Sequence, residues 1–111
     1  MIKELLKHLF KKPATLQYPF ERVPLQDFRG KPTWDIKKCT GCELCYKVCP
    51  SHAIEMTGKG REAEFTHHLD RCLFCGQCAE VCPVTAITMA EEYELSYYDR
   101  DGMVTEYTRE K

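Results

Sequence analysis

The sequence predicts a small α+β protein in which two copies of one β–α–β unit form a central domain between two flanking segments. Two cysteine runs with the same internal spacing begin at Cys39 and Cys72, 33 residues apart. Apolar residues around the two runs match at the same offset, which indicates an internal repeat. The sequences on either side do not continue it. We therefore expect a docking region of residues 1–34, a central domain of residues 35–90 and a C-terminal extension of residues 91–111.

Residues 1–12 have the periodicity of an amphipathic helix that ends before Pro13. Apolar side chains recur at intervals of three and four residues, and lysines occupy another face. The apolar stripe could pack on the protein's own domain, lie on a membrane surface or dock on a partner subunit, and the sequence leaves these three open. Its members are Ile2, Leu5, Leu6, Leu9 and Phe10.

Residues 13–34 contain four prolines and predict an extended, irregular strap rather than a helix or a sheet. The strap also carries bulky aromatic side chains, which argue against a simple flexible linker. We expect these side chains to anchor the strap in grooves of a partner subunit. The expected anchors are Tyr18, Phe20, Phe28 and Trp34.

Each half of the repeat, residues 35–57 and 68–90, is expected to run strand, cysteine loop, short helix, strand. A further strand is predicted at residues 64–67, where His67 and the following His68 are expected to face solvent. No histidine is expected to bind metal. Whether the polar, tyrosine-rich extension packs on the core stays open. Matching apolar positions should line a shared core, and they are Val48/Val81, Ala53/Ala86, Ile54/Ile87 and Met56/Met89.

Both cysteine runs read Cys-x2-Cys-x2-Cys-x3-Cys-Pro, and they use all eight cysteines of the chain. Two residues between cysteines allow one tight loop to place three thiolates around an iron–sulfur cubane, so the runs predict two 4Fe-4S clusters. Gly41 and Gly76 allow backbone to pass close to the cluster. Zinc sites usually close with two cysteine pairs or with histidine, and a disulfide framework needs an oxidising compartment. No catalytic residues are predicted, because no nucleophile–base pair, phosphate loop or dinucleotide fingerprint is present.

The paired runs resemble those of the bacterial-type two-cluster ferredoxins, whose fold is a pseudo-twofold βαβ repeat. In those proteins the fourth cysteine of each run binds the other cluster. The resemblance therefore implies two crossed ligand sets. The first cluster would take Cys39, Cys42, Cys45 and Cys82, and the second would take Cys72, Cys75, Cys78 and Cys49.

The flanks extend the resemblance over nearly the whole chain. The sequences at residues 12–19, 28–30, 72–78 and 92–95 look like the ferredoxin-like subunit of the respiratory complex I family. That family includes the energy-converting membrane-bound NiFe hydrogenases and related archaeal complexes. The length of the chain favours these over the quinone-reducing arm of complex I, which stays an alternative.

The resemblance implies an electron-relay subunit of a membrane-bound oxidoreductase with no substrate chemistry of its own. Electrons would arrive from a soluble ferredoxin or another subunit. They would leave toward a small subunit that carries a terminal cluster, next to a NiFe-type or quinone-site large subunit. Residues 1–12 would contact a membrane-embedded subunit or the membrane surface on its cytoplasmic face, without a transmembrane helix, and no nucleic acid is expected. A freestanding soluble ferredoxin is the competing function, against which the long flanks and mixed charge argue.

Overall fold

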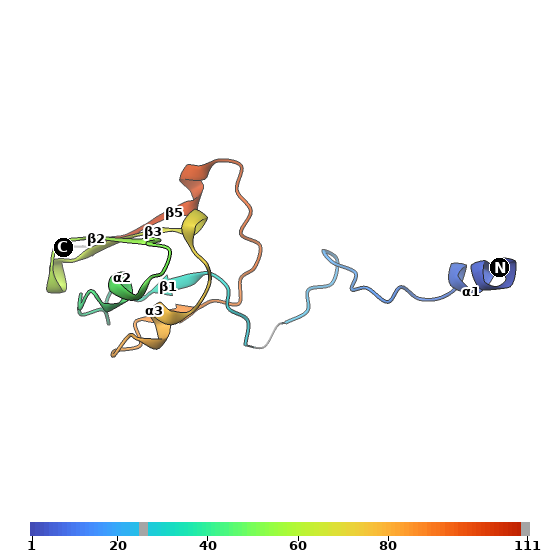
Figure 1. Ribbon diagram of the computed structural model, residues 1–111, viewed down its shortest axis with the longest axis horizontal. Helices are drawn as coiled ribbons and strands as arrows, with labels where there is room; N and C mark the ends of the chain where they lie inside the picture. The colour runs from blue at the N-terminus through green and yellow to red at the C-terminus, as the bar shows by residue number, and fades with distance from the viewer. Residues whose placement is uncertain (25–26, 110–111) are drawn as a thin grey trace.

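The structure is a computed structural model that describes residues 1–24 and 27–109. The predicted strap and C-terminal extension include residues 25–26 and 110–111, which lie outside the described residues. The molecule measures 70 × 30 × 26 Å. A compact α+β body lies at one end, and a long N-terminal arm that ends in helix α1 leaves it (Figure 1). The body holds the cysteines, so the arm extends away from the chemistry.

Two small antiparallel sheets build the body. Strands β1 (Pro32–Trp34) and β4 (Ile87–Met89) pair across the two halves of the repeat. In the second sheet, β3 (Glu64–His68) lies between β2 (Ile54–Thr57) and β5 (Val104–Tyr107). β3 confirms the strand predicted at residues 64–67. β1 and β5 lie outside residues 35–90, yet each pairs with a strand inside that range.

Short helices follow the cysteine loops. They are α2 (Leu44–Val48) in the first half and α3 (Gln77–Glu80) in the second. The order strand, loop, helix, strand is as predicted, but the leading strands β1 and β3 come earlier than the predicted halves 35–57 and 68–90, and end at residues 34 and 68. Three single turns of 3-10 helix join the other elements: η1 (Gly60–Glu62), η2 (Leu69–Arg71) and η3 (Arg100–Met103).

The core lies between the two sheets and is built from equivalent residues of both halves. Ala53, Ile54, Ala86 and Ile87 are at most 5% exposed, as the repeat predicts. The matched pairs Val48/Val81 and Met56/Met89 are half-buried. Trp34, Cys45, Ala63 and Phe65 also belong to the buried core. A core this small buries little apolar surface, so bound clusters would contribute to its stability as well.

The prediction that His67 and His68 face solvent is wrong. His67 is 1% exposed, and the side chain of His68 is 15% exposed. Side chains alternate along a strand, and Phe65 of β3 points into the core. His67 therefore points inward as well, and burial lowers the pKa of its imidazole to about 4.

The strap differs from its prediction at its C-terminal end, because residues 32–34 form β1 rather than irregular chain. Trp34 is buried in the protein's own core, so its expected role as an anchor in a partner is wrong. Tyr18 and Phe28 both contact the ring of Tyr93 in the C-terminal segment, with ring centroids 5.9 and 6.1 Å apart. Phe20, at 91% exposure, is the one predicted anchor that stands fully free among the described residues.

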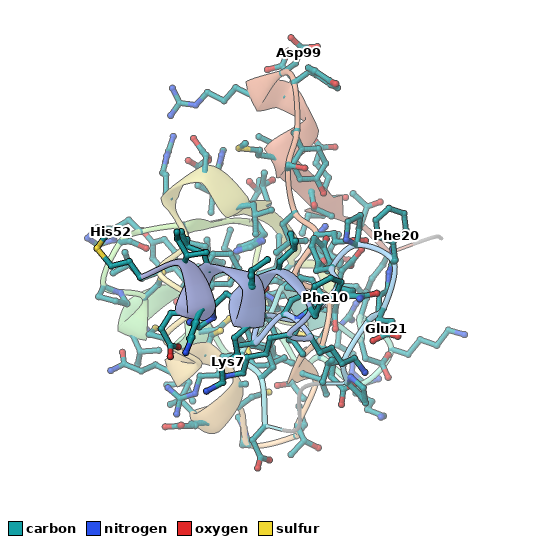
Figure 2. The ribbon with its side chains drawn as sticks, turned by 90° about the vertical axis from the view of Figure 1, so that its right-hand side faces the viewer. Lys7, Phe10, Phe20, Glu21, His52 and Asp99 are labelled. Atoms are coloured by element: carbon teal, nitrogen blue, oxygen red, sulfur yellow. The ribbon has the colours of Figure 1, made fainter. Side chains whose placement is uncertain are left out.

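Helix α1 (Ile2–Leu9) forms where the periodicity predicts it, and it buries no residue. The apolar stripe therefore does not pack on the protein's own domain, the first of the three possibilities. Figure 2 views the molecule from this end, with the side chains of Lys7 and Phe10 on the front segment and Phe20 on the strap. None of the helices in residues 1–24 and 27–109 is long and apolar enough to cross a bilayer.

Candidate metal centres

Two cavities in the body are each lined by four cysteines. The first is lined by Cys39, Cys42, Cys45 and Cys82. The second is lined by Cys49, Cys72, Cys75 and Cys78. Each cavity takes three consecutive cysteines from one run and the last cysteine of the other run. The structure therefore brings together the two sets that the ferredoxin resemblance implies.

The loops that shape the cavities share one backbone conformation. Positive φ angles occur in pairs of positions 33 residues apart, at Gly41 and Phe74 and again at Glu43 and Gly76. His52 and Thr85 form a third such pair, with φ of 49° and 46°. Each pair includes at least one non-glycine residue, for which this conformation costs roughly 1 kcal/mol or more. The geometry therefore repeats even where the residue type does not, because both loops must wrap a group of the same shape.

Backbone N–H groups point at the cysteine sulfurs in both halves. The N–H of Ala53 donates to Cys49 Sγ, and that of Ala86 donates to Cys82 Sγ, each at 3.3 Å. These are equivalent bonds to the last cysteine of each run. Donors of this kind stabilise negative charge on sulfur and are one of the levers by which a protein sets a cluster's potential.

Burial raises the pKa of the thiols of Cys45 and Cys78, which are equivalent residues, to about 11. Burial also raises the pKa of Cys72. A buried thiolate is unfavourable without a positive centre beside it, so these thiols become ligands only in contact with a metal. Iron of a 4Fe-4S cluster fits that requirement.

The spacing of the thiols fits a cluster better than a single ion. In residues 1–24 and 27–109, no three cysteine, histidine, aspartate or glutamate side chains gather closely enough to hold one metal ion. Tetrahedral zinc would require sulfurs about 3.8 Å apart, given zinc–sulfur bonds of about 2.3 Å. A cubane is a larger cage with thiolates at its corners, so it needs sulfurs that surround a cavity rather than a point. None of the eight cysteines forms a disulfide.

The flanking segments add contacts that the cysteine pattern does not predict. Arg29 of the strap donates to the carbonyl oxygen of Cys75 at 2.9 Å and packs over Gly76. Arg109 donates to the carbonyl oxygens of Cys39 and Arg61. One arginine from each flank thus clamps one cysteine loop. The resemblance includes Arg29, in the segment 28–30, whereas no sequence signal distinguishes Arg109.

Comparison with known proteins supports the same cofactor. Residues 38–86 match the family described as the 4Fe-4S dicluster domain. The chloroplastic NAD(P)H-quinone oxidoreductase subunit I of Chlorokybus atmophyticus is 47% identical over 102 residues, which span 84% of this chain and 58% of that protein. Subunit I of Gloeobacter violaceus is 40% identical over 101 residues, which span 84% of this chain and 48% of that protein.

A solved structure agrees with these relatives. A chain in the structure of the membrane-bound sulfane sulfur reductase, an archaeal respiratory membrane complex, is 40% identical with a TM-score of 0.69. The match covers 88% of this chain and 55% of that chain, so the present chain spans about half the length of the relatives it matches. The predicted α+β dicluster fold and the two 4Fe-4S clusters are confirmed. Residues 38–86 thus carry a 4Fe-4S dicluster domain, and the chain is homologous to subunit I of the NAD(P)H-quinone oxidoreductases and to a chain in the sulfane sulfur reductase structure.

Proposed function

We propose that this chain is the electron-relay subunit of a membrane-bound respiratory oxidoreductase. The bound clusters supply one-electron redox chemistry. The chain contributes the ligands, in the crossed sets Cys39/Cys42/Cys45/Cys82 and Cys49/Cys72/Cys75/Cys78. The observation that carries the proposal is the pair of four-cysteine cavities in one small body, joined to an arm that the body does not bury. A freestanding carrier has no use for such an arm.

The arm supports docking at a membrane. The exposed fractions of Ile2, Leu5, Leu9 and Phe10 lie between 68% and 85%, so the whole apolar stripe of α1 is uncovered. Lysines border the stripe and complement anionic lipid headgroups. We place α1 on a membrane-embedded subunit and the adjoining lipid surface, on the cytoplasmic side, with the strap laid along neighbouring subunits.

Residues 18–22 of the strap are attached to the C-terminal segment of the body, so the residues before them leave the body in a defined direction. Glu94 accepts hydrogen bonds from Tyr18 and from Arg22, each at 2.6 Å. Both pairs are exposed to solvent, so each contributes little to stability on its own. Together with the ring contacts to Tyr93 they hold residues 18–22 against the C-terminal segment. Residues before Tyr18 can then reach a partner while the cysteine body keeps its place.

The partners follow from what the chain lacks. No catalytic constellation is predicted on it, so the substrate chemistry belongs to other subunits. We propose a small subunit with a terminal cluster and a NiFe-type large subunit or its counterpart in a related archaeal complex, with soluble ferredoxin as donor. The homologue in the sulfane sulfur reductase structure supports the archaeal type. The subunit I homologues support the alternative of a quinone-site partner.

Native purification tests the proposal. Membranes are solubilised anaerobically in mild detergent, the chain is captured by a C-terminal tag, and co-purifying subunits are identified by mass spectrometry. We expect a large subunit, a small iron–sulfur subunit and membrane-embedded subunits in stoichiometric amounts. Recovery of the chain alone from the soluble fraction, with its clusters intact, would instead establish the freestanding carrier. The large subunit recovered decides between nickel–iron and quinone chemistry.

A further inference from the structure

Trp34 and His67 occupy equivalent positions in the two halves of the repeat, 33 residues apart, and they meet in the core. Trp34 belongs to β1 and is 7% exposed, whereas His67 belongs to β3 and is 1% exposed. Their ring centroids lie 5.0 Å apart, and the ring of Tyr107 lies 5.1 Å from Trp34. Trp34 therefore packs against two rings of the facing sheet, one from β3 and one from β5, which restrict the orientation of its indole.

Trp34 lies between the two candidate cluster sites. It lines the cavity of Cys39, Cys42, Cys45 and Cys82, and it also lines the cavity of Cys49, Cys72, Cys75 and Cys78. Among the described residues it is the one side chain that borders both. The indole thus forms part of the wall that separates the two sites.

The indole N–H is buried without a hydrogen-bond acceptor anywhere in residues 1–24 and 27–109. A buried donor without a partner costs about 1–3 kcal/mol, and such groups are rare unless a ligand satisfies them. Trp34 shares the buried core cluster with Cys45, and both side chains line the first cavity. Cys45 is also the one buried cysteine of the eight. A buried N–H beside this cysteine fits a sulfur acceptor supplied on cluster binding.

We propose that the Trp34 indole N–H donates a hydrogen bond to sulfur at the first cluster, at Cys45 Sγ or an adjoining sulfide, and raises the reduction potential of that cluster. One-electron reduction adds one negative charge that the sulfurs share. A donor N–H therefore stabilises the reduced form more than the oxidised form. This inference deepens the proposed relay function and rests on the crossed ligand sets, because it assigns Trp34 to the cluster that Cys45 binds.

Isotope labelling tests the hydrogen bond without changing the core. Trp34 is the only tryptophan of the chain, so indole-¹⁵N tryptophan labels this site alone. Hyperfine spectroscopy of the reduced holoprotein should show a ¹⁵N coupling and an exchangeable proton coupling on one cluster signal. That signal should be the one altered by Cys42→Ser, since Cys42 lines the first cavity only. Absence of ¹⁵N coupling in a preparation with both clusters reduced would overturn the inference and leave the relay function standing.

Potentiometry tests the consequence. Trp34→Phe keeps an aromatic ring and removes the N–H, and His67→Phe is the matched control, which removes ring nitrogen from the equivalent position. With Trp34→Phe we expect the reduced-to-oxidised ratio of the first cluster at a fixed potential to fall about tenfold, or ~59 mV for a one-electron couple, with the second cluster unchanged. Equal shifts of both clusters, no shift, or the same shift with His67→Phe would contradict the proposal. A wild-type protein without iron would instead refute the proposed function.

Discussion

Replacement of Gly41 by alanine tests whether the cysteine loops require the backbone geometry described above. Gly41 has a φ of +68°, and a Cβ built there would lie 1.8 Å from the carbonyl oxygen of Gly60 and 2.6 Å from its carbonyl carbon. The left-handed conformation alone costs a non-glycine residue roughly 1–2 kcal/mol. The contact with backbone cannot be relieved by a rotamer change, so the η1 turn must move away from the first cysteine loop.

Two other glycines separate the cost of the left-handed backbone from the cost of the steric clash. Gly60 has a φ of +61°, and an added Cβ meets nothing within 4 Å. Gly76 has a φ of +78°, and an added Cβ approaches only the Arg29 side chain, at 3.7 Å. Gly60→Ala and Gly76→Ala should therefore cost about 1–2 kcal/mol each, a factor of about 5 to 30 in an equilibrium between open and closed loop. Gly41→Ala should exceed both, with a loss above about 3 kcal/mol, or more than a hundredfold.

Anaerobic bleaching of the iron–sulfur absorption in guanidinium chloride measures this series. Because cluster loss is irreversible, the rate of bleaching is compared rather than a midpoint. We expect Gly60→Ala and Gly76→Ala to bleach moderately faster than wild type, and Gly41→Ala to bleach far faster or to lose the first cluster during purification. If Gly41→Ala kept its full iron content and bleached at the rate of Gly60→Ala, the close approach of η1 to the first loop would be refuted.

Three further predictions follow from named contacts. Glu43→Gly should slow bleaching. Glu43 has a φ of 65°, whereas the equivalent residue of the second half is Gly76, so the change relieves roughly 1 kcal/mol of backbone strain. The change also removes a 3.3 Å surface ion pair with Lys47, worth about 0.3–0.5 kcal/mol, and bleaching faster than wild type would contradict the prediction. Trp34 emission should be strongly quenched in the holoprotein and recover when a chelator removes iron, and equal emission in both states would place Trp34 away from the clusters. The double variant Leu5→Lys/Leu9→Lys should release the chain from membranes at full iron content, and membrane retention of this variant would exclude α1 as the anchor. Lys3→Ala/Lys11→Ala should weaken binding at low ionic strength and differ little from wild type at raised ionic strength, where salt screens the lysines.

The sequence predicted the cluster ligands better than the backbone conformation and packing around them. Each cysteine motif places three thiolates in one loop, and the resemblance to two-cluster ferredoxins implies the fourth, so both cavities could be anticipated. The equivalent core residues Ile54 and Ile87 followed from the same offset. The left-handed backbone of Phe74 and Glu43 could not, since only the requirement of a loop around a cluster, and no side-chain property, imposes it.

Trp34 and His67 show why the rest escaped prediction. Four prolines in residues 13–34 indicate irregular chain, and a three-residue strand such as β1 carries too little periodicity to oppose that signal. Its strand character depends on pairing with β4, more than fifty residues away. His67 and His68 are adjacent in a strand and cannot both face solvent, and the alternation from Phe65 places His67 inside. The pairing of β5 with β3 is likewise a tertiary contact without a local signal.

The central claim is that two clusters are held by crossed sets of cysteines in one relay body. The most direct test is anaerobic iron and sulfide analysis combined with electron paramagnetic resonance of wild type, Cys82→Ser and Cys49→Ser. Wild type should contain about eight iron and eight sulfide per chain. Cys82→Ser should alter the same signal as Cys42→Ser, and Cys49→Ser should alter the same signal as Cys75→Ser. If Cys82→Ser instead altered the signal that Cys75→Ser alters, each run would hold its own cluster and the account would be wrong.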